Sequence, residues 1–379
     1  MIYSFLVYST VFVGLLLLAI SSSKRVLSLH HIEEDFRAFW TPENSVSLLL
    51  FTLVFGFRYD VGVDYENYAY IYTHSGERSD SLEFLFLAIT NLMRDNGISL
   101  GFYFSFWSFL QLFFLLYAFR KERYLYPYLI FVLFCGQYFL LWMNVIRQDL
   151  ATCIFIFAIE FIEKKKFFAF LLWILIASGI HQTALVLLLF YPIFMAKTDY
   201  LKHLTVLGQL SILFICLYIH INNYILIDFD RYLNMYMINS DYGGYSYGAI
   251  EHTSKDNVIG GTFILSFIVD AIIISYSEKL RNHYSSTKFN IFYTLYFVGV
   301  LFELLFGYSY ILERSFRYLR FFKLVITPYL LYYLYQKRKK TANVFLLLFV
   351  VLAFISSYFA IFSFSEDAKY QYHSILFDI

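Results

Sequence analysis

Long apolar runs, separated by short polar segments, fill most of the chain. A membrane-spanning α-helix needs roughly 20 predominantly apolar residues, so each run near this length is a candidate span. The pattern therefore predicts an all-α polytopic integral membrane protein with about 12 transmembrane helices. We place these helices near residues 3–21, 45–57, 100–119, 127–142, 147–163, 167–194 (two short spans), 204–221, 258–276, 289–306, 321–335 and 344–362.

Two apolar segments depart from this length rule. Residues 82–93 are too few to cross a membrane, so we expect them to lie along its surface or to dip into it. Residues 167–194 are too many for one span and are interrupted by the polar stretch 178–182. The interruption predicts a tight hairpin of two short spans, with His181 at its outward-facing tip.

Basic residues orient the predicted helices, because cytoplasmic loops of membrane proteins are enriched in Lys and Arg. Basic clusters follow every second span, beginning with the first, for example at residues 24–25, 120–123, 164–166 and 337–340. If these clusters are inside, both chain ends are outside and the external loops fall near residues 58–81, 222–257 and 307–320. No soluble domain or linker stands out, so residues 1–379 are expected to form a single transmembrane domain.

The composition argues against a soluble protein. Hydrophobic residues make up 60% of the chain and charged residues 15%, whereas a soluble protein is about half apolar and a quarter charged. The net charge of +1 gives no global field for nucleic acid, so no such partner is expected. The cysteines lie in apolar runs, and no cluster has metal-ligand spacing, so neither a metal nor another cofactor is expected.

The segment from Arg58 to Tyr68 begins where the second predicted span ends. Gly62 permits a turn that a side chain would hinder, and Asp64 adds a carboxylate. Arginine binds phosphate as a planar charged fork, while tyrosine rings stack on sugars. The alternative is an interfacial anchor, because Tyr and Arg are common at membrane boundaries.

Several arginines are exceptions to the inner location of basic residues. They lie at or near the outer ends of predicted spans and are Arg58, Arg147, Arg314, Arg317 and Arg320. Charges at a membrane edge are costly and usually line a cavity or pair with something. Arginines that converge there suit a ligand with two or more phosphates, and an anionic lipid headgroup is the alternative ligand.

Local sequence adds detail to these outer residues. Arg147 opens a predicted helix, where its guanidinium adds to the positive end of the helix dipole; the alternative is a side chain that snorkels to the interface. Arg314 and Arg317 share a helix face. His181 is alone, and a lone histidine is more often structural, but the hairpin tip puts it at the depth of the arginines. The loop at 222–257 is rich in acidic and tyrosine side chains, which suit a carbohydrate and an ordinary external loop equally.

These residues resemble the EpsG/Wzy family of bacterial polysaccharide polymerases, which make O-antigen and exopolysaccharide. The first block of the resemblance is Arg58-x-x-x-Gly62-x-Asp64-Tyr65-x-x-Tyr68, and it is the most specific one. Later blocks follow in the same order: Asn144-x-x-Arg147-Gln148, then Ser178-x-x-His181-x-x-Ala184-Leu185, then, more loosely, the Arg/Tyr/Phe stretch at 314–322.

The resemblance implies a multi-pass enzyme of the bacterial inner (plasma) membrane, with GT-C-like architecture and an active site that faces the periplasm or outside. Such polymerases transfer a growing glycan from undecaprenyl diphosphate to the non-reducing end of the next lipid-linked repeat unit. The expected partners are therefore undecaprenyl-diphosphate-linked repeat units as donor and acceptor, membrane lipids and, as a further candidate, a chain-length regulator protein.

On this interpretation Asp64 or His181 is the general base and Arg147 acts on the departing diphosphate. Asp64 can equally orient Arg58 as an ion pair. The residues expected to bind the diphosphate or the glycan are Arg58, Tyr65, Tyr68, Asn144, Gln148, Arg314, Arg317, Tyr318 and Arg320.

Two other functions stay open at this stage. An O-antigen ligase shares the lipid donor but uses a lipid A acceptor. A transporter or flippase of lipid-linked oligosaccharides should carry charges through its spans and toward both faces, whereas the unusual charges here gather on the outer one.

Overall fold

The computed structural model describes residues 2–28, 36–74, 83–222, 260–307, 316–364 and 370–375. Within these ranges the regular elements are helices, which confirms the all-α prediction for the described chain. Contacts divide the chain into two compact units, Met1–Lys197 with Leu334–Ile379 (unit 1) and Thr198–Tyr333 (unit 2). Each unit is described by itself, and the single domain over residues 1–379 stays a prediction.

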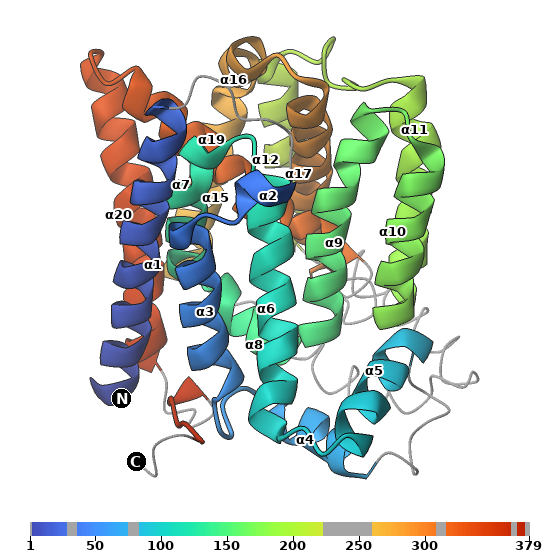
Figure 1. The fold of residues 1–379 in the computed structure, drawn as a ribbon. Helices are drawn as coiled ribbons and strands as arrows, with labels where there is room; N and C mark the ends of the chain where they lie inside the picture. Colours follow the sequence, from blue (N-terminus) through green and yellow to red (C-terminus); the bar gives the residue numbers. More distant parts are fainter. Residues whose placement is uncertain are drawn as a thin grey trace. The chain divides into compact units, whose positions relative to one another are not determined.

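Unit 1 is a bundle in which helices distant in sequence lie side by side (Figure 1). A row of neighbours runs through it, each packed on the next: α1 (Ile2–Ser28), α3 (Pro42–Gly56), α6 (Leu100–Ala118), α9 (Ile146–Glu163) and α10 (Phe167–Ile180). Behind this row, α7 (Tyr126–Cys135) contacts both α1 and α20 (Thr341–Phe364).

Helix α9 is the most enclosed helix of this row. Every residue from Gln148 to Glu160 is buried, and α9 packs on both α6 and α10. A helix that is apolar on all sides is stable only when other helices or lipid surround it. Residues at the start of α9, including Arg147, are therefore held by a packed scaffold.

Four described helices are long and apolar enough to cross a membrane: α1, α6, α17 (Thr287–Phe306) and α20. Shorter apolar helices of 10–17 residues accompany them. This set agrees with a polytopic membrane protein. The count of about 12 crossings and the GT-C-like architecture stay predictions.

The fourth predicted span is bent in the structure rather than straight. Helices α7 and α8 (Tyr138–Asn144) meet at an angle of 66°. Gln137 between them has a left-handed backbone with φ 62°, and its side-chain amide donates to the carbonyl oxygen of Ser357 in α20 at 2.6 Å. The bend turns the end of α8, and with it Asn144, toward the loop after α3.

The two ends of unit 1 differ in charge and in structure. At one end Arg120 and Lys164 both pair with Glu160, at 2.6 and 2.7 Å. The other end holds the short helices α4 (Tyr65–Thr73) and α5 (Phe84–Asp95), which contact each other (Figure 1). Helix α5 is the segment predicted to be too short to cross, and it packs on α10.

The predicted hairpin is present within unit 1. Helix α10 ends at Ile180, and η3 (Gln182–Leu189) followed by α11 (Phe190–Ala196) runs back along it. His181 is the single residue between the two arms, with φ −148° and ψ 109°. The apolar runs therefore predicted both arms and the residue at the turn.

Unit 2 contains α12 (Val206–Asn222), α15 (Gly261–Ser275), α16 (Ser277–Tyr284), α17 and the greater part of α19 (Phe322–Gln336). A buried ion pair joins two of these helices: Lys323 Nζ lies 2.6 Å from Asp270 Oδ2. The hydroxyl of Tyr296 donates to the other oxygen of Asp270 at 2.7 Å. This network fixes the start of α19 against α15 and α17. The predicted outer loop at 222–257 lies, from residue 223 onward, outside the described residues.

Candidate active site

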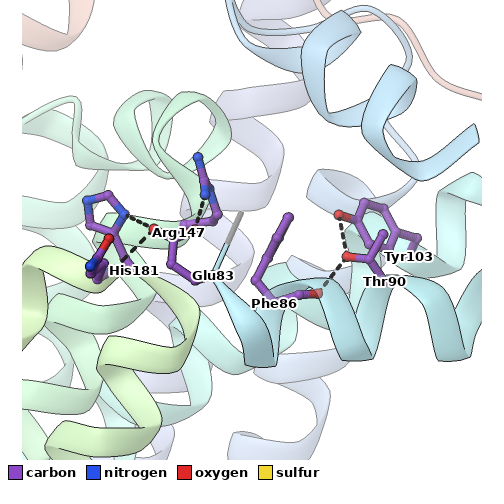
Figure 2. A network of polar contacts seen from close by, with 7 residues as sticks. Glu83, Phe86, Thr90, Tyr103, Arg147 and His181 are labelled. Atoms are coloured by element: carbon purple, nitrogen blue, oxygen red, sulfur yellow. Dashed lines mark hydrogen bonds and ion pairs between the residues drawn. The ribbon is translucent and has the colours of Figure 1, made fainter. Parts of the chain in front are cut away.

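The candidate active site is centred on the carboxylate of Glu83, just before α5. Glu83 has an extended backbone, with φ −67° and ψ 138°, and its side chain does not cap its own helix. The carboxylate instead reaches Arg147 and His181 (Figure 2). The side chains of all three are only partly buried, with exposed fractions of 12, 22 and 23% in that order. None of the three side chains is therefore fully enclosed.

Each oxygen of Glu83 has its own partners. Arg147 Nη1 donates to Oε2. Oε1 lies 3.0 Å from Nδ1 of His181 and accepts the backbone N–H of Gln182 at 3.1 Å. Arg147, His181 and Gln182 come from the start of α9 and the hairpin tip, so the carboxylate ties three separate segments together. Charge-assisted bonds of this kind are stronger than neutral ones.

The pKa of Glu83 fixes the charge state of this group. Burial would raise that pKa, but the hydrogen bond from His181 and the charge of Arg147 outweigh burial and lower it from 4.5 to about 2. The carboxylate is therefore ionised near neutral pH and can only accept hydrogen bonds. It follows that Nδ1 of His181 carries the proton, and in the neutral ring Nε2 keeps its lone pair.

Aromatic side chains form a floor under the charged group. The guanidinium of Arg147 lies over the ring of Phe86, 5.2 Å from its centroid, and Phe86 packs on Trp107. Thr90 donates to the carbonyl oxygen of Phe86 and contacts the hydroxyl of Tyr103 at 3.3 Å (Figure 2). Apolar walls lower the local dielectric and strengthen the charged contacts above them.

Tyr68 and Asp64 lie beside this group on α4. The buried phenol of Tyr68 hydrogen-bonds Arg147. Asp64 precedes it by one helical turn, which places both side chains on one face of α4, and its charge acts on the phenol. Of the two predicted bases, His181 contacts the Glu83 carboxylate directly, whereas the charge of Asp64 acts on Tyr68.

Arg58, a predicted diphosphate ligand, lies buried with each of its three nitrogens donating to a backbone carbonyl. Nε binds Val61 at 3.2 Å, Nη2 binds Met143 at 3.1 Å, and Nη1 binds Phe55. Phe55 and Met143 belong to the last turns of α3 and α8, where carbonyls lack helical partners. A cation there offsets the negative ends of both helices. Arg58 thus joins two helix ends.

Asn144 and Gly62 lock the loop that follows. The side-chain oxygen of Asn144 accepts the N–H of Val63 at 2.7 Å, and its amide donates to the hydroxyl of Tyr370 at 3.1 Å. Gly62 has φ +104°, and a Cβ there would lie 2.6 Å from the same Asn144 oxygen. Glycine is therefore required twice, by its backbone angle and by this close approach.

The remaining predicted residues of unit 1 are largely enclosed. Tyr65 is buried and stacks on Phe104 with centroids 4.8 Å apart. Gln148 is buried inside α9. Both positions support the site's scaffold, and neither side chain is presented to solvent.

In unit 2, Arg317 and Arg320 line a small cavity with aromatic walls. Its lining also includes Phe302, Phe316 and Glu303, and Arg320 Nε pairs with Glu303 at 3.1 Å. Tyr318, between the arginines, is buried. Arg314 lies outside the described residues.

No group of three or more His, Cys, Asp or Glu side chains that could hold a metal ion occurs in the described part of the chain. The prediction of metal independence stays a prediction.

The model of the EpsG family matches residues 45–374, which is most of the chain. The chain belongs to the EpsG family. The match covers both units, including Glu83, Arg147 and His181. Neither a curated protein nor a solved structure matches the chain.

Two parts of this candidate site were not predicted from the sequence. The first is Glu83, which lies at the edge of the short apolar segment 82–93. A single carboxylate at the start of an otherwise apolar helix is the feature that could have indicated it. The second is the segment 370–375, which contacts Arg58 through an isolated bridge with Ser374. Nothing in the sequence pattern predicted that contact.

Proposed function

We propose that this chain is a glycosyltransferase that polymerises lipid-linked glycan repeat units at the outer face of a bacterial inner membrane. Membership of the EpsG family supports a polysaccharide polymerase-type role in general. The observation that carries the finer proposal is the contact of Glu83 with both His181 and Arg147. The donor is a glycan on undecaprenyl diphosphate and the acceptor is the non-reducing end of the next lipid-linked unit.

In the proposed reaction His181 is the general base. Its Nδ1–H is held by Glu83, so the free Nε2 takes the proton from the acceptor hydroxyl as that oxygen attacks the anomeric carbon of the donor. The bond from the anomeric carbon to the diphosphate breaks, and the lipid diphosphate leaves with the electron pair. Glu83 itself, with its pKa near 2, is too weakly basic for this step.

Arg147 is proposed to stabilise the departing diphosphate. Its Nη1 is engaged by Glu83, but its buried Nε has no acceptor among the described residues. A small shift would turn this donor toward a phosphate oxygen, and the start of α9 adds its positive dipole end. Preorganised donors that meet developing charge lower the barrier without reorganisation.

The other predicted residues take supporting roles in this proposal. Arg317 and Arg320 bind an anionic part of a lipid-linked substrate, since the cavity that they line combines charge with phenylalanine rings. Arg314, outside the described residues, keeps its predicted role as a further anion ligand. Arg58 and Asn144 hold the loop that presents Asp64 and Tyr68.

A knockout strain complemented with variants separates the proposal from its rivals. In a strain whose glycan is attached to lipid A, loss of a polymerase leaves single repeats on lipid A. Loss of a ligase leaves none, and loss of a flippase traps lipid-linked units inside the cell. We expect the knockout and the Glu83→Gln strain to show single repeats on a surface-glycan gel, and bare lipid A or trapped units would overturn the assignment.

A further inference from the structure

Residues 370–375, here called the tail segment, cross the ends of two helices of unit 1. The N–H of Tyr372 donates to Ser4 Oγ at 2.8 Å, and Tyr8 donates to the carbonyl oxygen of Tyr370 at 3.2 Å. The hydroxyl of Tyr372 donates to Val54 O at 2.8 Å. Val54 lies in the last turn of α3, so the tail segment satisfies a carbonyl that has no helical partner.

The tail segment also pairs with the loop after α3. Tyr59 N–H donates to His373 O at 2.9 Å, and Ile375 N–H donates to Phe57 O at 2.8 Å. These bonds flank Arg58, whose guanidinium joins the ends of α3 and α8. The backbone on both sides of Arg58 is therefore held by residues more than 300 positions away.

One further contact connects the tail segment to Asn144, close in sequence to Arg147. The hydroxyl of Tyr370 accepts from the amide of Asn144 at 3.1 Å, while the oxygen of that amide holds Val63. Asn144 ends α8, and Arg147 lies in the first turn of α9. The side chain of Asn144 is thus fixed from two directions, three residues before the arginine that meets Glu83.

We propose that the tail segment is a positioning part of the active site, with Tyr370 as its key residue. By holding Asn144 and the loop from Arg58 to Asp64, it sets the placement of α4 and of the start of α9. The functional half of this inference rests on the proposed glycosyl transfer. The structural half, that Tyr370 orders the loop, can be measured without any activity.

Tyr370→Phe in the full chain tests both halves, because it removes one hydroxyl and keeps the ring. Tyr358→Phe is the matched control: it loses a 3.0 Å contact with Ser9 that joins α20 to α1 and does not involve the loop. Hydrogen exchange of the purified proteins should show amides of residues 57–66 exchanging at least ~5-fold faster in Tyr370→Phe and unchanged in Tyr358→Phe. Turnover on lipid-linked repeat units should fall roughly tenfold in the first variant only.

A double variant with Asn144→Ala distinguishes a positioning role of Tyr370 from a general loss of stability. If Tyr370 acts through Asn144, Tyr370→Phe lowers kcat in the wild-type background and has little further effect in the Asn144→Ala background. Unchanged loop exchange in Tyr370→Phe, or equal acceleration in Tyr358→Phe, overturns the inference. A wild-type protein that orders the loop through Tyr370 but never extends a glycan would instead contradict the proposed function.

Discussion

The carboxylate of Glu83 lies 3.0 Å from Nδ1 of His181, although 98 positions separate the two residues. The contact fixes the ring so that Nε2 is free to accept a proton. It also explains why a histidine sits at the tip of a hairpin whose arms are otherwise apolar.

Replacing His181 should remove the general base while the fold persists. We expect His181→Gln to lower the rate of glycan extension by about 10²–10⁴. His220→Gln is the control, because His220 lies in α12 of unit 2, where it contacts the carbonyl of Leu304 and stacks on the ring of Phe263. Initial rates per amount of folded protein provide the measurement. Extension by His181→Gln within threefold of wild type would remove the histidine from the mechanism.

Stability should depend on pH through Glu83. Its pKa is lowered from 4.5 to about 2 on folding, so its stabilising contribution is complete above about pH 4.5 and is lost as pH falls toward 2. Arg147→Gln removes one cause of that lowering. The difference in Tm between wild type and Arg147→Gln should therefore be largest near neutral pH and shrink below about pH 4. A difference in Tm that stays constant across this pH range would show that Arg147 does not lower the pKa of Glu83.

The Gly62 turn should tolerate no side chain. In Gly62→Ala a left-handed residue costs about 1 kcal/mol and the approach to Asn144 adds to it, for a loss of roughly 1–3 kcal/mol. Gly97→Ala is the matched control, since Gly97 also has a positive φ of 67° but nothing within 4 Å of a new Cβ. Thermal unfolding in detergent measures both. Equal losses in the two variants would mean that only the backbone angle matters.

The two ends of unit 1 should face opposite sides of the membrane. Reporters fused after Arg120 or Lys166 should indicate the cytoplasm, and a reporter after Tyr68 the outside. Arg147, which pairs with Glu83, lies at the start of α9, and Glu160, which pairs with Arg120, lies near its end, so the two pairs are at opposite ends of this helix. An external signal at Lys166 would place the candidate site on the cytoplasmic side of the membrane, whereas the proposed lipid-linked substrate is on the outer side.

Run length and charge placed Arg147 and His181 correctly at neighbouring helix ends. Both positions follow from local features: an arginine where an apolar run starts, and a polar break in a run too long for one helix. The bend at Gln137 was missed, because its cause is a contact with Ser357 on a distant helix.

Contacts across long sequence separations account for what could not be predicted. Arg58 has the residue type of a phosphate ligand, yet its nitrogens meet carbonyls of α3 and α8. No periodicity reveals that two helix ends converge on one side chain. The role of Glu83 likewise depends on Arg147 and His181, which lie 64 and 98 positions away in the sequence.

Substitutions at the Glu83–Arg147 pair test most directly the claim that this pair and His181 form the active site. A second ion pair in the same chain serves as the control. Arg120 and Glu160 form a similarly enclosed pair at the opposite end of unit 1, with exposed fractions of 11 and 10%. Lysine keeps the charge of arginine but loses the planar fork. Purified proteins would be assayed with lipid-linked repeat units, reading the rate and length of the polymer.

The account predicts that Arg147→Lys and Glu83→Gln each lower the rate by about tenfold to a thousandfold. Arg120→Lys and Glu160→Gln should change it by no more than about threefold per folded protein, since any loss of that pair acts on stability alone. Near-normal polymer from both Arg147→Lys and Glu83→Gln, or an equal loss from the control pair, would contradict the assignment of Glu83, Arg147 and His181 as the active site.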